Sequence, residues 1–336
     1  MTNVFEGKTI LVTGGCGSVG TEIVTQLLNY KPKVIRVLDH DEAGHFKLNQ
    51  KIKSGRIRNL IGDIRDRERL IRAMEDVDII FHAAALKHVP FCEYNPFEAV
   101  NTNVVGTKNL IDAAIEKNVE KMISISTDKA VNPVNTMGAT KLLAEKIVTN
   151  APMGKRKSKF CCVRFGNVLD SVGSVIPIFR KQIEEGGPIT ITSKEMTRFF
   201  MSLPDAVHLI LKAAESVHGG EIFILKMDAL RIVDLAEVMV EELAQKYGYD
   251  PKKIKYEYIG VRPGEKIHEA LMSREEAGYM VETADMIILR NSLLAVHSYG
   301  KMKVNNKTMH EDYESNKVKL LNKKEVKEVL YKNNIL

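Results

Sequence analysis

The chain has 336 residues, of which 49 are Lys or Arg and 43 are Asp or Glu, so its formal net charge is +6. This length suggests about two domains or one large α/β unit, and 44% hydrophobic residues exclude extensive low-complexity disorder. The mild positive charge does not by itself indicate nucleic acid, since an anionic, phosphate-bearing substrate is an equal explanation.

The first half of the chain alternates short apolar runs with amphipathic stretches. The runs predict strands at Thr9–Thr13, Val34–Leu38, Asp78–Ala85, Met122–Ser126 and Phe160–Phe165. The stretches between them predict helices at Val19–Leu28, Arg67–Met74, Ala99–Glu116 and Gly138–Val148. This alternation predicts an α/β fold with a Rossmann-like, doubly wound parallel sheet, whose ligands bind at the C-terminal edge of the strands.

The second half is less regular. It predicts strands at Ile189–Thr192, Glu221–Leu225 and Lys253–Ile259. It predicts helices at about Pro204–Val217, at Val233–Tyr247 and at Leu321–Leu330, where Asn322 and Glu325 form a capping box. We expect a smaller C-terminal α/β unit here.

A glycine-rich loop follows the first predicted strand. In TGGCGSVG, Gly14, Gly17 and Gly20 have G-x-x-G-x-x-G spacing, and a helix begins near Ser18. Glycine lets the backbone approach a pyrophosphate closely, and a helix N-terminus offers it unpaired N–H groups. An ordinary tight turn is the alternative, but the strand before the loop and the helix after it favour a dinucleotide site.

Acidic and small residues end the next strands. Asp39 lies about 20 residues after the loop, where a carboxylate accepts ribose hydroxyls and repels a 2′-phosphate; with no Arg at positions 40 or 41, this favours NAD over NADP. Asp63 and Ile64 suit an adenine, and Ala83–Ala85 leave room for a cofactor across the strand end. Each of these alone also fits a turn or tight packing, so they support the prediction without establishing it.

The fifth predicted strand ends in a chemically active sequence, Thr127-Asp128-Lys129. Lys141 follows at the spacing of the Y-x-x-x-K pair of short-chain dehydrogenases/reductases, but the Tyr position is Met137, which cannot exchange a proton. An acid and a base on one scaffold can remove a proton next to a ketone and expel a hydroxyl. A surface ion pair is the alternative for Asp128-Lys129, and its place at the sheet edge favours catalysis.

Further polar groups follow in RFGNV, GSVIP, MTRF and RPGEK. Arg198 and Arg262 are of the type that clamps a diphosphate, because a guanidinium donates two parallel hydrogen bonds to phosphate oxygens. Glu265 could accept hydrogen bonds from ribose hydroxyls. Structural ion pairing is the alternative for either arginine.

Together these motifs resemble the UDP-N-acetylglucosamine 4,6-dehydratases of the Met-x-x-x-Lys type. These enzymes belong to the extended short-chain dehydrogenase/reductase superfamily and to the polysaccharide biosynthesis protein family. The likeness runs from about Lys8 to Lys266 and is carried by HAAALKHVPFCEYNPFEAVNTNVVGT, STDKAVNPVNTMGATK and RPGEK, with a C-terminal DYESN. Asp170 and Val172 stand where many members have Gly and Arg, which bears on the exact sugar and nucleotide.

The resemblance implies a reaction. NAD takes hydride from sugar C-4, Lys129 removes the C-5 proton, Asp128 protonates the departing C-6 hydroxyl, and the hydride returns to C-6. Thr127 assists at the C-4 hydroxyl, and Lys141 holds the nicotinamide ribose. The expected product is a UDP-2-acetamido-2,6-dideoxy-4-hexulose for surface polysaccharide or nonulosonic-acid synthesis, with inversion at C-5 left open. A 4-epimerase, which normally needs the missing Tyr, and a catalytically silent NAD-binding protein are the alternatives.

The resemblance also implies two domains and two sets of binding residues. We expect an NAD-binding domain over residues 1–168, with segments near 200–225 returning to it, and a nucleotide-sugar-binding domain over residues 169–336. The expected cofactor residues are Gly14, Gly17, Ser18, Val19, Gly20, Asp39, His40, Asp63, Ile64, Ala83, Ala84, Ala85, Asn103, Ser126 and Lys141. The expected substrate residues are Lys87, Asn167, Val175, Ile176, Pro177, Thr192, Arg198, Arg262 and Glu265.

Cysteine content and targeting signals bear on the compartment. The four cysteines form no C-x-x-C, and the adjacent Cys161 and Cys162 are poorly spaced for zinc, so we expect no metal and a reduced, cytoplasmic protein. We expect no signal peptide and no membrane span. The basic tail from about Lys301 interleaves acids, as a solvated face does, so we expect no nucleic-acid or membrane partner. The resemblance implies a homo-oligomer, a dimer or a hexamer.

Overall fold

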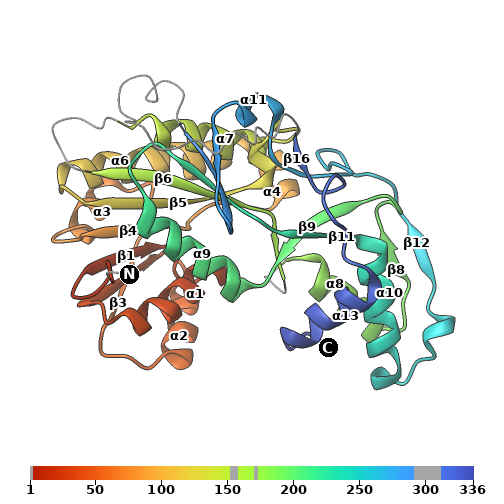
Figure 1. The fold of residues 1–336 in the computed structure, drawn as a ribbon. Coiled ribbons are helices and arrows are strands. Elements are labelled where there is room, and N and C mark those ends of the chain that lie inside the picture. Colours follow the sequence, from red (N-terminus) through yellow and green to blue (C-terminus); the bar gives the residue numbers. More distant parts are fainter. Residues whose placement is uncertain (1–2, 152–157, 170–172, 291–311) are drawn as a thin grey trace.

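A mostly parallel sheet forms the centre of the computed structural model, which describes residues 3–151, 158–169, 173–290 and 312–336 (Figure 1). Within those residues the sheet has nine strands in the order β14-β15-β10-β6-β5-β4-β1-β2-β3. They are β1 (Thr9–Thr13), β2 (Val34–Asp39), β3 (Ile57–Ile61), β4 (Ile79–His82), β5 (Lys121–Thr127), β6 (Lys159–Phe165), β10 (Ile222–Leu225), β14 (Met280–Glu282) and β15 (Met286–Leu289). Neighbours from β3 to β10 pair in parallel, and β15 and β14 add an antiparallel edge. The predicted Rossmann-like α/β fold is confirmed.

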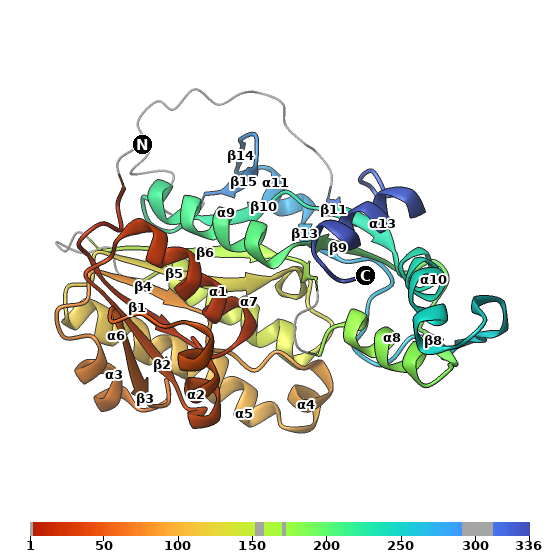
Figure 2. The same cartoon turned by 90° about the horizontal axis from the view of Figure 1, so that it is seen from below.

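Helices cover both faces of the sheet (Figure 2). On one face α1 (Ser18–Leu27) packs against α9 (Leu203–Ser216), and on the other α6 (Thr107–Glu116) packs against α3 (Arg67–Ala73) and α7 (Thr136–Thr149). A further helix, α2 (Glu42–Lys51), connects β2 to β3. Because both faces are covered, every residue of the central strands β1 and β4 is buried, whereas the edge strand β3 is largely exposed.

The predicted helix Ala99–Glu116 is interrupted. Two short helices, α4 (Val89–Tyr94) and α5 (Pro96–Val100), are followed by a π-helical segment at Asn101–Gly106 before α6 begins. Inside that segment the Asn103 side chain accepts a hydrogen bond from Leu86 N and donates to Leu86 O and to Thr140 Oγ1. The wider turn sits where Asn103 ties the helix to the β4 loop and to α7, and π-bulges of this kind are frequent at functional sites.

The remaining elements form a smaller cap at one end of the sheet (Figure 1), except β13, α11 and β16, whose apolar residues pack into the core of the sheet. They are β7 (Asn167–Val168), α8 (Val175–Glu184), β8 (Ile189–Ile191), β9 (Thr197–Met201), β11 (Asp228–Arg231), α10 (Ile232–Leu243), β12 (Tyr256–Tyr258), β13 (Ala270–Met272), α11 (Arg274–Ala277), β16 (Tyr313–Glu314) and α13 (Lys323–Lys332). The cap has an apolar core of its own, in which α8, α10 and α13 meet. The capping box of Asn322 and Glu325 is present at the start of α13.

Some predicted elements have different bounds. The strand predicted at Asp78–Ala85 ends at His82, because the chain leaves the sheet where Ala83 and Ala84 pass over the glycine loop. The strand predicted at Lys253–Ile259 is β12 alone, since Pro251–Lys253 forms a 3₁₀ turn. The division at residue 168 stays a prediction, and Asp170 and Val172 lie outside the described residues.

A buried ion triad joins the sheet to the C-terminal elements. Arg164, on β6, is fully buried and donates to both carboxylate oxygens of Glu145 on α7, at 3.0 and 2.7 Å. It also donates to both oxygens of Glu276 on α11, at 2.9 and 3.0 Å, and to the carbonyl of Leu271. One guanidinium therefore fixes α7, β13 and α11 to the sheet.

Candidate functional site

A cavity of about 1080 Å³ follows the C-terminal edge of the sheet and continues under the cap. Its wall includes the residues after β1, the ends of β2 and β5, and the loops after β3, β4 and β6, together with β7, α8 and the RPGEK loop. Pockets for one drug-sized ligand measure roughly 300–1,000 Å³. The cavity is therefore large enough for an extended ligand or for two ligands.

The glycine loop forms one end of the cavity. Gly14 has a φ of +66°, and a Cβ placed there would lie 2.5 Å from Ala84 N, so only glycine fits. Gly17 differs, because its φ is −72° and a Cβ would meet only Gly14 O, at 3.4 Å. The helix α1 starts after Gly17 without a side-chain cap, so its first N–H groups are available to an anion. Ser18, Val19 and Gly20 also line the cavity.

The acidic residues lie at the ends of β2 and β3 as predicted. Asp39 and His40 line the cavity, and Asp39 Oδ2 accepts a hydrogen bond from Cys16 N at 3.0 Å, so the carboxylate also fixes the glycine loop. Asp63 and Ile64 line it too, and Asp63 forms an ion pair of 2.6 Å with Arg65. The hydrogen bonds from Arg65 hold the pKa of Asp63 below its ordinary value. The sequence analysis did not include Arg65 in this wall.

The strand β5 delivers the Thr127-Asp128-Lys129 sequence to the floor of the cavity. Thr127 and Lys129 line the cavity, whereas Asp128 is fully buried behind them. Its Oδ1 accepts hydrogen bonds from Thr127 Oγ1 at 2.8 Å and from Lys129 Nζ at 2.9 Å, and its Oδ2 has no partner. The structure brings the three residues together, with Asp128 in contact with the two exposed groups rather than with the cavity itself.

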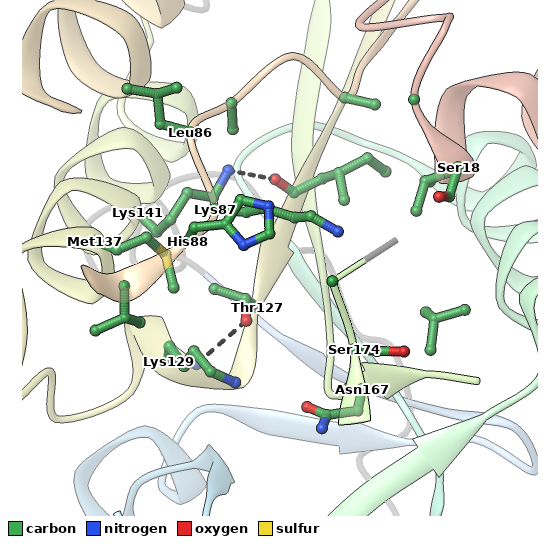
Figure 3. A pocket seen from close by; sticks show the side chains of 18 of the residues that line it. Ser18, Leu86, Lys87, His88, Thr127, Lys129, Met137, Lys141, Asn167 and Ser174 are labelled. Carbon is green, nitrogen blue, oxygen red and sulfur yellow. Dashed lines mark hydrogen bonds between the residues drawn. The ribbon is translucent and has the colours of Figure 1, made fainter. Parts of the chain in front are cut away.

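Lys141 and Met137 lie side by side on α7. Figure 3 shows Met137, Lys141 and Lys129 on one side of the cavity and Asn167 and Ser174 on the other. Lys141 Nζ donates to Ile125 O at 2.6 Å, and burial holds the pKa of Lys141 below its ordinary value. The thioether of Met137 offers no acid or base at the position of the usual Tyr.

A buried hydrogen-bond chain supports the floor. His82 lies between Thr13 Oγ1, 2.8 Å from Nδ1, and Thr107 Oγ1, 3.0 Å from Nε2. Thr107 Oγ1 in turn donates to Asn103 O. Burial lowers the pKa of His82 to about 3, so the ring is neutral and serves as a link. Asn103 does not line the cavity, because its side chain is engaged by Leu86 and Thr140.

The predicted substrate residues gather in the half of the cavity under the cap. Lys87, Asn167, Thr192, Arg198, Arg262 and Glu265 all line it. Arg198 donates to the carbonyls of Thr197, Lys266 and Ile267, so part of its guanidinium fixes the RPGEK loop. Arg262 is exposed, and Glu265 Oε2 is buried without a partner.

The Val175–Pro177 stretch forms the first turn of α8, and only part of it reaches the cavity. Val175 lines the wall together with Ile178 and Phe179. Ile176 is buried in the core of the cap, and Pro177 is not part of the wall. Residues three and four apart share a helix face, so consecutive residues on a helix cannot all contact one ligand.

The sequence analysis missed Glu269, which lines the cavity opposite Lys129. Its Oε1 lies 3.6 Å from Lys129 Nζ, and its buried Oε2 has no partner. The available signal was an acid inside the run Ile267 to Met272, where a charged side chain is costly unless it has a task.

Among the residues that the structure describes, four oxygen atoms in the cavity wall are buried without a hydrogen-bond partner. They belong to Ser126, Ser174, Glu265 and Glu269. Buried polar atoms are nearly always paired in proteins. These oxygen atoms are therefore available to polar groups of ligands at both ends of the cavity.

Residues 10–291 match the profile of the family described as polysaccharide biosynthesis protein. A relative from Methanocaldococcus jannaschii, named an uncharacterized membrane protein, is 55% identical over 98% of this chain and 97% of its own. The UDP-N-acetylglucosamine 4,6-dehydratase (inverting) of Campylobacter jejuni is 42% identical over 90% of this chain and 88% of its own. A UDP-glucose 4-epimerase of Rickettsia bellii is 41% identical over 97% of this chain and 96% of its own.

A solved structure is similar over nearly the full length. The X-ray structure of Pen from Bacillus thuringiensis is 43% identical, covers 98% of both chains and superposes with a TM-score of 0.89. In the part of the chain that the structure describes, none of the helices is both long and apolar enough to cross a lipid bilayer.

Proposed function

The chain belongs to the polysaccharide biosynthesis protein family, and on that premise we propose that it is an NAD-dependent UDP-N-acetylglucosamine 4,6-dehydratase. The observation that carries the proposal is one cavity that joins a glycine-rich loop to Lys129 and Met137. A relative named for this activity, 42% identical over 90% of the chain, supports it.

The cofactor residues fit a dinucleotide. Gly17 has no Cβ, and the space left beside it lies next to the first N–H groups of α1, which have no side-chain cap. Ser126 Oγ, at the end of β5, is buried without a hydrogen-bond partner among the described residues. We assign the pyrophosphate to the glycine loop, the adenosine to Asp39 and Asp63, and the nicotinamide ribose to Lys141. When bound, NAD would supply the hydride acceptor and donor of the reaction.

The reacting residues have distinct tasks in this proposal. Lys129 is the base that takes the C-5 proton, since its amine reaches the cavity at the end of β5, beside Thr127. Asp128, which accepts hydrogen bonds from Thr127 and Lys129, takes from Lys129 the proton removed from C-5 and returns it to the departing C-6 hydroxyl, so that water leaves. Thr127 orients the C-4 hydroxyl. The substrate's diphosphate and ribose are assigned to Arg262, Arg198 and Glu265, and its sugar to Lys87, Asn167 and Thr192.

The proposal is tested directly with the purified protein, without added cofactor. Incubation with UDP-N-acetylglucosamine is expected to yield a product lighter by one water, detected by mass spectrometry. NMR of the product formed in deuterated solvent would assign C-5 as retained or inverted. A protein that carries NAD and gives no such product would overturn the proposal for this sugar.

A 4-epimerase is the second candidate, favoured by the 41% identical relative of that name. It would return an isomer of unchanged mass in the same incubation. The thioether of Met137 where an epimerase normally has Tyr argues against it. A catalytically silent protein would give neither product.

The cofactor assignment predicts different outcomes for two glycines. Gly17→Ala is expected to keep near-wild-type stability, because its backbone is ordinary and the new methyl meets only one atom at contact distance. That methyl would occupy the pyrophosphate position, so NAD should bind at least about tenfold more weakly. Gly14→Ala is expected to destabilise the fold, because of the clash with Ala84 and the positive φ.

The measurement is the amount of nucleotide released per chain from each denatured variant, together with its melting temperature. A Gly17→Ala protein that melts normally and retains its full nucleotide content would contradict the placement of the pyrophosphate.

We further propose a cytoplasmic homo-oligomer with a cofactor domain over residues 1–168 and a substrate domain over residues 169–336. Oligomerisation is supported by Phe91, Tyr94 and Phe97, which lie on the neighbouring helices α4 and α5 with 70%, 88% and 73% of their surfaces exposed. Exposed apolar patches of this kind mark interaction sites.

A further inference from the structure

The carboxyl group of Glu269 faces Lys129 from a different part of the chain. Glu269 lies between the RPGEK loop and β13, and its Oε1 is 3.6 Å from Lys129 Nζ. Lys129 is thus placed between two acids, Asp128 at 2.9 Å on one side and Glu269 on the other. The sugar chemistry proposed above gives Glu269 no role.

The C-terminal DYESN motif fixes Glu269 in this place. The strand β16 pairs with β13, and Ser315 N donates to Glu269 O at 2.9 Å. The fully buried Ser315 Oγ accepts a hydrogen bond from Glu269 N at 3.1 Å and lies 2.7 Å from Thr197 Oγ1. The N–H and the carbonyl of Glu269 are therefore both hydrogen-bonded to Ser315, which lies 46 residues further along the chain. These bonds fix the backbone from which the Glu269 side chain extends.

Charged groups from several described elements face the pair formed by Lys129 and Glu269. Asp128 lies on the same turn as Lys129, Arg198 comes from β9, and Lys266 comes from the RPGEK loop, where it donates to Val131 O. Burial lowers the pKa of Lys129, but Asp128 and Glu269 outweigh it, so the net pKa lies above its ordinary value. Burial raises the pKa of Glu269, and Asp128 adds to this, against Lys129, Arg198 and Lys266.

These directions create a conflict with the use of Lys129 as a base. An amine with a raised pKa carries a proton at neutral pH and cannot accept another. Of the two acids beside it, Asp128 Oδ1 already accepts two hydrogen bonds. Each acid has one buried oxygen without a hydrogen-bond partner among the described residues, but Glu269 also has a raised pKa and faces Lys129 across 3.6 Å, so it is the carboxyl group better able to take the proton.

We propose that Glu269 is a positioning residue that acts through Lys129, by accepting its proton and leaving it as a neutral amine. One N–H bond of Lys129 breaks and one O–H bond of Glu269 forms, so the ammonium–carboxylate pair becomes an amine–carboxylic acid pair. Side-chain rotation brings the two groups from 3.6 Å to about 2.9 Å for the transfer. A ligand that excludes water from the cavity favours the neutral pair, because desolvation penalises both charges.

The first test measures the proton on Lys129 directly and does not depend on any reaction. The protein as purified is treated with acetic anhydride over a pH series, and acetylation of Lys129 is quantified by peptide mass spectrometry. Glu269→Gln keeps the size of the side chain and removes its charge. The pH at which Lys129 becomes reactive is expected to fall by about one unit, a tenfold gain in reactivity at fixed pH.

A matched control is Glu314→Gln, on the adjacent β16, since Glu314 pairs with Lys317 and makes no ion pair with Lys129 among the described residues. In the Glu314→Gln variant, the pH midpoint for acetylation of Lys129 is expected to equal that of the wild type. An unchanged midpoint in Glu269→Gln would overturn the proposal, whatever reaction the protein catalyses.

The second test measures turnover and rests on the proposed dehydratase function. The wild type is expected to show a flat kcat near neutral pH. In the Glu269→Gln variant the lowered pKa of Lys129 eases loss of the proton only in the open cavity. Once substrate excludes water, that proton has no Glu269 carboxylate to accept it, so kcat should fall by about tenfold at pH 7 and rise with pH, while Glu269→Asp restores part of the flat profile. A kcat lowered equally at every pH would indicate a merely structural role and overturn the proposal. Absence of turnover in the wild type would overturn the dehydratase assignment, and the acetylation test would still decide the role of Glu269.

Discussion

Lys129→Met is expected to lower turnover of UDP-N-acetylglucosamine by about 10²–10⁴-fold, the range that a general base contributes. Methionine has a similar length and no titratable group, so it removes the base and leaves the shape of the cavity. The measurement is kcat from the rate at which the dehydrated product forms. Exchange of the C-5 hydrogen with deuterated solvent should be lost in parallel, because both need the same base.

The fold and the bound nucleotide should survive this change. Lys129 keeps 25% of its side-chain surface exposed to the cavity, and Arg198 and Lys266 remain as nearby cations. The pKa of Glu269 is already raised by burial and rises further when Lys129 is absent, which favours its uncharged form. Lys181→Met is the matched control, since Lys181 is exposed on α8 and pairs only with Glu185 among the described residues. Turnover that persists in Lys129→Met would show that the base has been assigned wrongly.

The N-terminal half of the fold could be predicted because its strands and helices are specified by short sequence patterns within each element. β1 ends at Thr13 and α1 begins at Ser18, as the apolar run and the glycine spacing indicate. The antiparallel edge was not predictable, because β14 and β15 come after a long irregular stretch and join the sheet beside β10. Nothing local in a strand of three or four residues specifies which distant strand it pairs with.

The site could be predicted where a residue acts through its own type, and not where it acts through a partner. Glycine, lysine and aspartate positions near β1, β2 and β5 line the cavity as expected. The pairing of Asp63 with Arg65, the engagement of Asn103 by Leu86 and the approach of Glu269 to Lys129 depend on side-chain directions in space. Those side-chain directions follow from tertiary packing, which cannot be read from the spacing of residues along the sequence.

Arg164→Met is expected to lower the free energy of unfolding by about 3–5 kcal/mol, the usual cost of breaking a buried ion pair. The guanidinium is fully buried and pairs with both Glu145 and Glu276. Methionine fills part of the volume but removes the cation that the buried Glu145 and the partly buried Glu276 share. For a protein whose total stability is about 5–15 kcal/mol, this is a large fraction, and urea unfolding followed by circular dichroism measures it.

Arg67→Met is the matched control, because the Arg67–Glu116 pair is equally short at 2.7 Å but about half exposed. Exposed pairs contribute only about 0–1 kcal/mol. An equal loss in both variants would show that burial is not the cause of the effect.

The pH dependence of Arg164→Met identifies the cause as uncompensated charge. Burial raises the pKa of Glu276, but Arg164 outweighs it and holds the net value below the ordinary one. A carboxyl group with a lowered folded-state pKa stabilises the fold above its unfolded value, about 4.5, and this contribution is lost as pH falls through the folded pKa. In the variant, burial acts on Glu276 against only the Ser273 N–H group and Lys146, so the pKa of Glu276 is higher than in the wild type and it takes up a proton at a higher pH. The stability difference between wild type and variant should therefore narrow from pH 7 to pH 4, whereas a loss of packing alone would leave it constant.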